Sequence, residues 1–142
     1  MATRLKNLSD RLAGDVAQYY KSSDVEFEPR WFTLIYALKN GAELTITQLA
    51  TMLNQTHPAI NQVANTLVSK GLVEELRDSK DQRKRIIRLS KKGSKLVKQM
   101  GPLWSLIKKA NDDLLKESTD LLEALEAVEQ ALDKKSMLER LK

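Results

Sequence analysis

Four cationic side chains lie within six consecutive residues of one polar stretch. Three are in the predicted loop that spans residues 78–84, and the fourth is the residue just after it. They are Lys80, Arg83, Lys84 and Arg85. A hairpin tip is narrow enough to enter the minor groove of duplex DNA, whose negative potential attracts arginine. Asp81, two residues before Arg83, can accept a charge-assisted hydrogen bond and fix the loop. Taken alone, such a cluster can equally be solvated surface charge.

A second candidate surface lies on a predicted helix from Thr56 to Lys70. With its apolar stripe turned inward at about 100° per residue, the opposite face is polar but almost uncharged. That face holds Pro58, Gln62, Asn65 and Ser69, flanked by Asn61 and Thr66, with Thr56, His57 and Ala59 at the helix start. Asn and Gln can pair bidentately with adenine, whereas Arg is the usual reader of guanine. We therefore hypothesise an A·T-leaning DNA target; the alternative is that these amides are ordinary exposed residues.

Basic residues are concentrated in the middle of the chain. The net charge of the 142 residues is +5, yet residues 44–98 carry eleven basic and four acidic side chains. Residues 1–43 are neutral overall, and residues 99–142 have a net charge of −2. A basic segment between neutral and acidic flanks indicates a localised surface for a polyanion.

Composition narrows the class of protein. With 42% apolar and 30% charged residues, we expect a globular and mainly helical chain. The absence of cysteine excludes disulfides, thiolate metal sites and thiol catalysis, and it fits a cytoplasmic protein. The N-terminus lacks the apolar core of a signal peptide, and no apolar run approaches ~18 residues, so we expect neither secretion nor a membrane span.

Two short helices and a hairpin must position the candidate surfaces. The helix signals are a capping box at Thr45 and Gln48, a turn at Asn54–Gln55, a cap at Thr56, a proline at position 58 and a stop at Gly71. Helices of about nine and fifteen residues joined by a three-residue turn match a helix-turn-helix. Strand-like segments at 72–77 and 85–89 follow as a hairpin, and residues 44–46 form a very short strand.

Further helices flank this unit. They are predicted from Thr3 to about Lys21, Pro29 to about Asn40, Ser90 to about Leu115, and about Thr119 to Arg140. Pro102 predicts a kink or a helix boundary near Met100–Gly101. Leu121, Leu125, Val128 and Leu132 form a heptad-like seam in the last helix, and such a seam requires a partner helix. That partner could come from the same chain, although we favour a second copy.

The order of these elements resembles the MarR family of bacterial regulators. The most specific motif runs from Asp81 through Arg83 to Leu89-Ser90 and Gly93, and it resembles the family's wing signature. The segments Leu49-Ala50, Gln55–Ile60 and Lys70–Val73 are also similar to the family. Residues 27–32 further resemble a subgroup whose module precedes an acetyltransferase domain, a domain that we do not expect in this chain.

The resemblance implies a mainly α fold with a small β-hairpin wing. Residues 44–93 would be the winged helix-turn-helix that binds double-stranded DNA, and residues 1–43 and 94–142 would be helices that form a homodimer. It implies a sequence-specific, ligand-responsive repressor, with Arg83 at the family's minor-groove position. Small aromatic effectors often bind in this family, so Trp31, Tyr36 and Trp104 are candidate pocket residues; packed core is the alternative for all three.

Other classes of function have less support. His57 is the single histidine, and without cysteine partners it does not make a metal site. We expect no cofactor, and we expect no enzyme, because the chain has neither a glycine-rich phosphate loop nor a nucleophile elbow. A protein–protein interaction module that binds an acidic partner through the basic face is the alternative to DNA binding.

Overall fold

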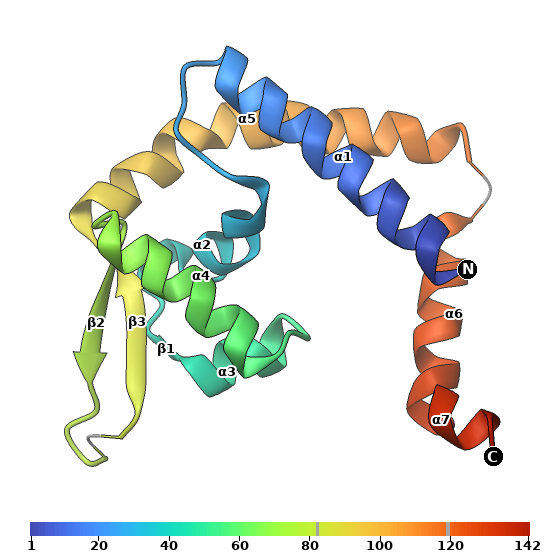
Figure 1. Ribbon diagram of the computed structural model, residues 1–142. Helices are drawn as coiled ribbons and strands as arrows, with labels where there is room; N and C mark the ends of the chain where they lie inside the picture. The colour runs from blue at the N-terminus through green and yellow to red at the C-terminus, as the bar shows by residue number, and fades with distance from the viewer. Residues whose placement is uncertain (82, 119) are drawn as a thin grey trace. The chain divides into compact units, whose positions relative to one another are not determined.

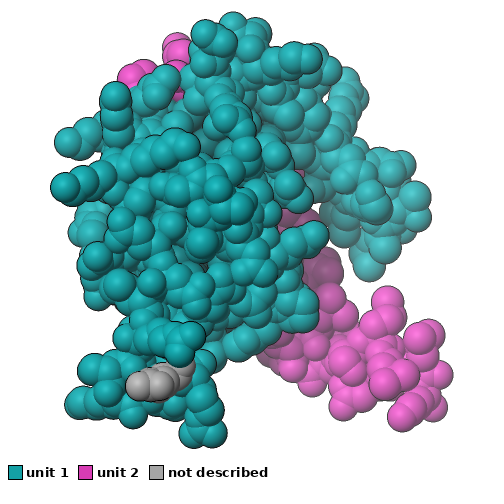
Figure 2. Space-filling view, turned by 60° about the vertical axis from the view of Figure 1, so that its left-hand side comes forward, with its two compact units in different colours: residues 1–101 teal, residues 102–142 magenta. Residues whose placement is uncertain are grey.

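The computed structural model describes residues 1–81, 83–118 and 120–142. The chain forms two compact units, residues 1–101 and residues 102–142, which Figure 2 shows in separate colours. The elements of the first unit are α1 (Ala2–Ser22), η1 (Pro29–Trp31), α2 (Phe32–Ala37), η2 (Lys39–Gly41), β1 (Leu44–Thr45), α3 (Ile46–Met52), α4 (His57–Ser69), β2 (Val73–Arg77) and β3 (Arg85–Leu89). Helix α5 (Lys91–Lys116) begins in the first unit and ends in the second, which also holds α6 (Leu121–Lys134) and α7 (Met137–Arg140).

The helix-turn-helix has the predicted end signals. Thr45 Oγ1 accepts a hydrogen bond from Gln48 N at 3.1 Å, and Gln48 Oε1 accepts one from Thr45 N at 2.9 Å, which completes a capping box for α3. The turn after α3 places Asn54 at a left-handed φ of 48°, a conformation that asparagine tolerates. Thr56 Oγ1 then accepts from Ala59 N at 3.3 Å and caps α4. These contacts fix where α4 begins.

Helix α4 lies at the centre of the first unit and packs against α3, α2, η1 and β2 (Figure 1). Its inner side chains Ile60, Ala64 and Leu67 are at most 1% exposed. Other fully buried side chains of this core are Trp31, Leu34, Ile35, Leu38, Leu49 and Ile87. Burial on this scale holds the outer face of α4 in one orientation, because burying each large apolar side chain contributes roughly 1.5–3 kcal/mol to the stability of the fold.

The sheet is antiparallel with the strand order β1-β3-β2. Strand β3 is central: Ile87 faces Leu44 of β1 on one side and Glu75 of β2 on the other. The β2–β3 hairpin extends away from the helices as a wing (Figure 1). The prediction of a mainly helical fold with a small hairpin wing is therefore confirmed.

The start of α5 is tied to the end of α4. The Ser90 hydroxyl donates to Gly71 O at 2.6 Å and accepts from Gly93 N at 2.9 Å. A side chain at Gly93 would overlap the carbonyl oxygen of Leu72, so only glycine fits there. The backbone N–H of Ser90 also donates to Leu72 O at 3.1 Å.

Three predicted helix boundaries differ from the structure. The helix predicted over residues 29–40 is divided, because α2 ends at Ala37 and Asn40 adopts a left-handed φ of 63° within η2. The last helix is interrupted at Lys135, where the backbone is extended and Ser136 caps the separate helix α7. The predicted start of that helix, Thr119, lies outside the described residues. Helix α5 continues through Pro102, so the alternative of a helix boundary there is wrong.

The outer helices leave apolar side chains exposed. On α1, Leu5, Leu8 and Leu12 are 42%, 41% and 39% exposed. On α6, Val128 and Leu132 are each 41% exposed. Across the described residues, no helix combines the length and the apolar character needed to cross a membrane.

Candidate nucleic-acid interface

The outer face of α4 has the composition that its periodicity predicts. Thr56, His57, Pro58, Gln62 and Asn65 are exposed, whereas Ala59 and Asn61 are half-buried. Thr66 turns its hydroxyl back to the carbonyl oxygen of Gln62 at 3.0 Å. The helix thus presents amides and an imidazole at its N-terminal end, the end that enters the major groove in helix-turn-helix proteins.

The wing loop is shaped by a carboxylate that binds backbone amides. Asp78 Oδ1 accepts from Lys80 N at 2.7 Å and from Asp81 N at 3.3 Å, and these bonds lower the pKa of the Asp78 carboxyl. The backbone closes the loop where Lys84 N donates to Asp81 O at 2.9 Å. The side chains of Lys80 and Lys84 remain exposed.

Asp81 orients Arg83 in the way that the sequence predicts. Asp81 Oδ1 accepts from the backbone N of Arg83 at 3.0 Å and from its Nε at 3.3 Å. The Arg83 side chain nevertheless stays 94% exposed, while the Asp81 side chain is 36% exposed. The contact therefore holds the Nε edge of the guanidinium and leaves most of the side chain facing solvent.

Arg85 has a different environment from the other cations of the wing. Its Nη1 donates to Asn61 Oδ1 on α4 at 3.0 Å, and its Nε forms a 2.8 Å ion pair with Glu75 Oε2 on β2. Its side chain is only 23% exposed. Sequence analysis places Arg85 and Asn61 in two separate candidate surfaces, and the structure joins them through this bond.

These contacts bring the ends of three elements around one cavity of about 620 Å³. Its lining residues are Thr45, Ile46, Thr47, Gln48, His57, Asn61, Arg83, Lys84 and Arg85. The polar residues at the start of α3 were not among the predicted site residues, because the capping motif explained them locally. Lys80 and Asp81, which precede Arg83 in the wing loop, do not line this cavity.

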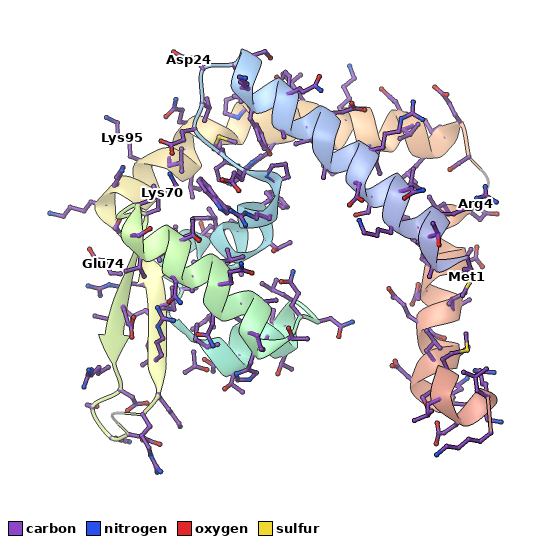
Figure 3. The ribbon with its side chains drawn as sticks, viewed as in Figure 1. Met1, Arg4, Asp24, Lys70, Glu74 and Lys95 are labelled. Carbon is purple, nitrogen blue, oxygen red and sulfur yellow. The ribbon has the colours of Figure 1, made fainter. Side chains whose placement is uncertain are left out.

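Several cations of the basic segment are already paired within the chain. Arg88 bridges Glu43 at 3.0 Å and Glu74 at 3.1 Å, and these two carboxylates raise its pKa. Lys70 lies at the C-terminal end of α4 (Figure 3) and pairs with Glu26. Its ammonium also lies 5.4 Å from the centroid of the Trp31 ring. Exposed cations therefore remain both on the wing, at Lys80, Arg83 and Lys84, and at the start of α5, at Lys91, Lys95 and Lys98.

The three candidate effector residues lie in different environments. Trp31 is 1% exposed and packs edge-on against Phe27, with 5.7 Å between the ring centroids. Tyr36 is 43% exposed on α2 and lies beneath the Lys39 ammonium. Trp104 belongs to the second unit. An effector pocket lined by these residues stays a prediction.

Two helices joined by a tight turn, followed by a hairpin with a basic tip, define a winged helix-turn-helix. The model of the MarR family matches residues 26–84, which include α3, α4 and most of the wing loop. Residues 26–84 are therefore similar to the MarR family of winged helix-turn-helix proteins, and this match covers less than half of the chain. The resemblance noted in the sequence is confirmed.

Three known proteins show the extent of the similarity. The HTH-type transcriptional regulator PetP of Rhodobacter capsulatus is 33% identical over 66 residues, which are 46% of this chain and 40% of PetP. A mutant of Escherichia coli MarR in complex with operator DNA has a TM-score of 0.71 at 20% identity, covering 92% of this chain and 91% of that one. Bordetella bronchiseptica BpsR, whose DNA binding is regulated by 6-hydroxynicotinic acid, has a TM-score of 0.61 at 18% identity, covering 94% and 98%.

Proposed function

We propose that this protein is a transcriptional regulator that binds a specific duplex DNA sequence as a homodimer. The observation that carries the proposal is the continuous polar surface made by the outer face of α4 and the basic wing. The bond from Arg85 to Asn61 connects the two parts. The relatives PetP and MarR support it, since one is a transcriptional regulator and the other is bound to operator DNA.

Each part of the surface has a distinct role in this proposal. The N-terminal half of α4 enters the major groove, where Gln62 and Asn65 contact base edges. Arg83 enters the adjacent minor groove from the wing tip. The exposed Lys80 and Lys84 contact phosphates, which strengthens binding to every sequence and makes it sensitive to salt.

A second copy of the chain would cover the exposed apolar side chains of the outer helices. Leu8 of α1 and Leu132 of α6 are examples, each 41% exposed in the single chain. A twofold dimer presents two copies of α4 to half-sites that lie about 34–36 Å apart on one side of the duplex. We infer a pseudo-palindromic operator for this reason, and repression wherever the operator overlaps a promoter.

A small aromatic ligand is the proposed effector class, by analogy with BpsR and 6-hydroxynicotinic acid. Such a ligand relieves repression only if it binds more tightly to a dimer whose α4 helices are misplaced for the two half-sites. Isothermal titration with 6-hydroxynicotinic acid, with and without bound operator, tests this linkage directly.

Binding of the purified protein to genomic duplex fragments tests the central proposal. Fluorescence anisotropy at several salt concentrations should show an affinity that falls steeply with salt, by about one log unit per log unit of salt for each phosphate contacted. An affinity for duplex DNA that does not change with salt would overturn the proposal. Tight binding to an acidic protein with no binding to DNA would instead favour an interaction module.

A further inference from the structure

We propose that Arg85 determines which base Asn61 reads. By holding the amide oxygen of Asn61 toward the wing, Arg85 turns the amide NH₂ group toward the major groove, and this orientation selects guanine over adenine at one base pair of each half-site. The inference rests on the proposed function, because it requires the N-terminal half of α4 to lie in the major groove.

The hydrogen bond itself fixes the orientation of the amide. Arg85 Nη1 lies 3.0 Å from Asn61 Oδ1. A guanidinium has only donors, so the group facing it must be the amide oxygen and not the NH₂ group. A flipped amide would place N–H against N–H, and the bond would be lost.

Arg85 is held in place by a second partner. Its Nε pairs with Glu75 Oε2 at 2.8 Å, and 23% of its side chain is exposed. Asn61 is itself half-buried on α4, beside the end of the hairpin that carries the loop. Because bonds from a charged donor are roughly twice as strong as neutral ones, the amide oxygen is already held toward Arg85 before DNA arrives.

The remaining donor of Asn61 distinguishes purines. Bidentate pairing with adenine needs an amide oxygen to accept from N6 and an amide N–H to donate to N7. Guanine presents two adjacent acceptors, N7 and O6, to which an NH₂ group can donate. Opposite adenine, the Asn61 NH₂ group would face another NH₂ group, which disfavours that base.

The other amides of α4 are not constrained in this way. Gln62 and Asn65 are exposed, and among the described residues their side-chain amides have no hydrogen-bond partner. They keep both a donor and an acceptor, so they can pair with adenine as the composition of the helix predicts. Within one A·T-leaning half-site, Asn61 therefore accounts for a single guanine.

Selection of bound sequences from a randomised duplex pool tests the inference. The wild-type protein should enrich guanine over adenine by roughly tenfold at one position of each half-site. Arg85→Met frees the amide oxygen and should move the preference at that position from guanine to adenine. The matched control Arg88→Met removes an arginine with two carboxylate partners from the same strand, and it should leave the preference unchanged.

A second variant keeps the inference testable if Arg85→Met fails to fold, which its thermal unfolding curve would show. Asn61→Asp retains an oxygen partner for Arg85 but offers only acceptors, so the same position should now favour cytosine, whose N4 is a donor. Identical base preferences in wild type, Arg85→Met and Asn61→Asp would overturn the role of Arg85. Failure of the wild-type protein to bind any duplex would instead overturn the proposed function.

Discussion

The hydroxyl of Ser90 donates a hydrogen bond to the carbonyl oxygen of Gly71 at 2.6 Å, and so joins the start of α5 to the end of α4. The hydroxyl oxygen of Ser90 also accepts a hydrogen bond from Gly93 N at 2.9 Å and so caps α5. One buried side chain thereby satisfies a carbonyl in the turn that follows α4 and an amide left over at the start of α5.

We expect Ser90→Ala to lower the free energy of unfolding by about 1–3 kcal/mol, since it removes the cap and leaves the carbonyl of Gly71 without this partner. Chemical denaturation measures the change. Ser94→Ala, at an exposed position in the first turns of α5, is the control and should be nearly neutral. Equal stabilities of the two variants would contradict this role of Ser90.

Gly93→Ala should be destabilising by about 1–3 kcal/mol or more, because the new methyl group overlaps the backbone carbonyl of Leu72. Gly101→Ala is a matched control on the same helix, with open space around the position. It should stabilise the protein by up to about 1 kcal/mol, the ordinary gain of alanine over glycine in a helix. The prediction fails if both variants shift the unfolding midpoint in the same direction.

Arg83→Ala should weaken binding to all duplex sequences and lower the salt slope of binding by about one. The reason is that Arg83 is 94% exposed at the wing tip, and in the proposed complex it contacts the groove without reading a base. Anisotropy titrations at four salt concentrations measure both quantities. Arg30→Ala, which removes an exposed arginine outside the wing, should leave the slope unchanged; an unchanged slope in Arg83→Ala as well would exclude the minor-groove role.

The wing loop should lose order in acid through Asp78. Two backbone amides hold the folded-state pKa of this carboxyl below its usual value of 3.8. Its contribution to stability is therefore complete above about pH 3.8 and is lost as the pH falls through the lower folded-state pKa. The amide resonance of Lys80, followed by NMR across this range, should shift with the titration, and Asp78→Asn should abolish that pH dependence. A Lys80 resonance that moves equally in the variant would assign the transition to another group.

Leu8→Asp should shift the protein from dimer to monomer, because it places a charge in the exposed apolar row of α1 without disturbing a buried core. Sedimentation velocity over a range of concentrations measures the change. Asn7→Asp introduces the same side chain at an exposed position about 100° around the same helix from Leu8, away from that row, and should leave the proposed dimer intact. A wild-type protein that sediments as a monomer at all concentrations would contradict the homodimer itself.

Local signals explain why much of the fold could be predicted from sequence. The capping pairs at Thr45 and Thr56 and the left-handed Asn54 each act within four residues, so their chemistry is visible in the chain. The same kind of signal was missed at Ser136, where a serine and a glutamate three residues later interrupt the last helix. The regular apolar spacing of that helix, which ends at Leu132, led us to predict that it continues through Lys135.

The contacts that organise the site could not be predicted in the same way. Asp81 and Arg83 are two residues apart, and their pairing follows from the sequence. Asn61 and Arg85 are 24 residues apart, and their bond depends on how the sheet packs against α4. Periodicity identifies which face of a helix points outward, but it does not show which outward side chain a neighbouring strand will bind.

The anchoring of Lys70 has a mechanical consequence. Its pairing with Glu26 and its contact with Trp31 fasten the C-terminal end of α4 to the segment that precedes α2. The 13 residues of α4 span about 20 Å, so a tilt of about 10° at this pivot would displace the N-terminal end by about 3 Å. A displacement of this size exceeds what a hydrogen bond to a base tolerates, so the contacts that hold both ends of α4 would also preserve base reading in the proposed complex.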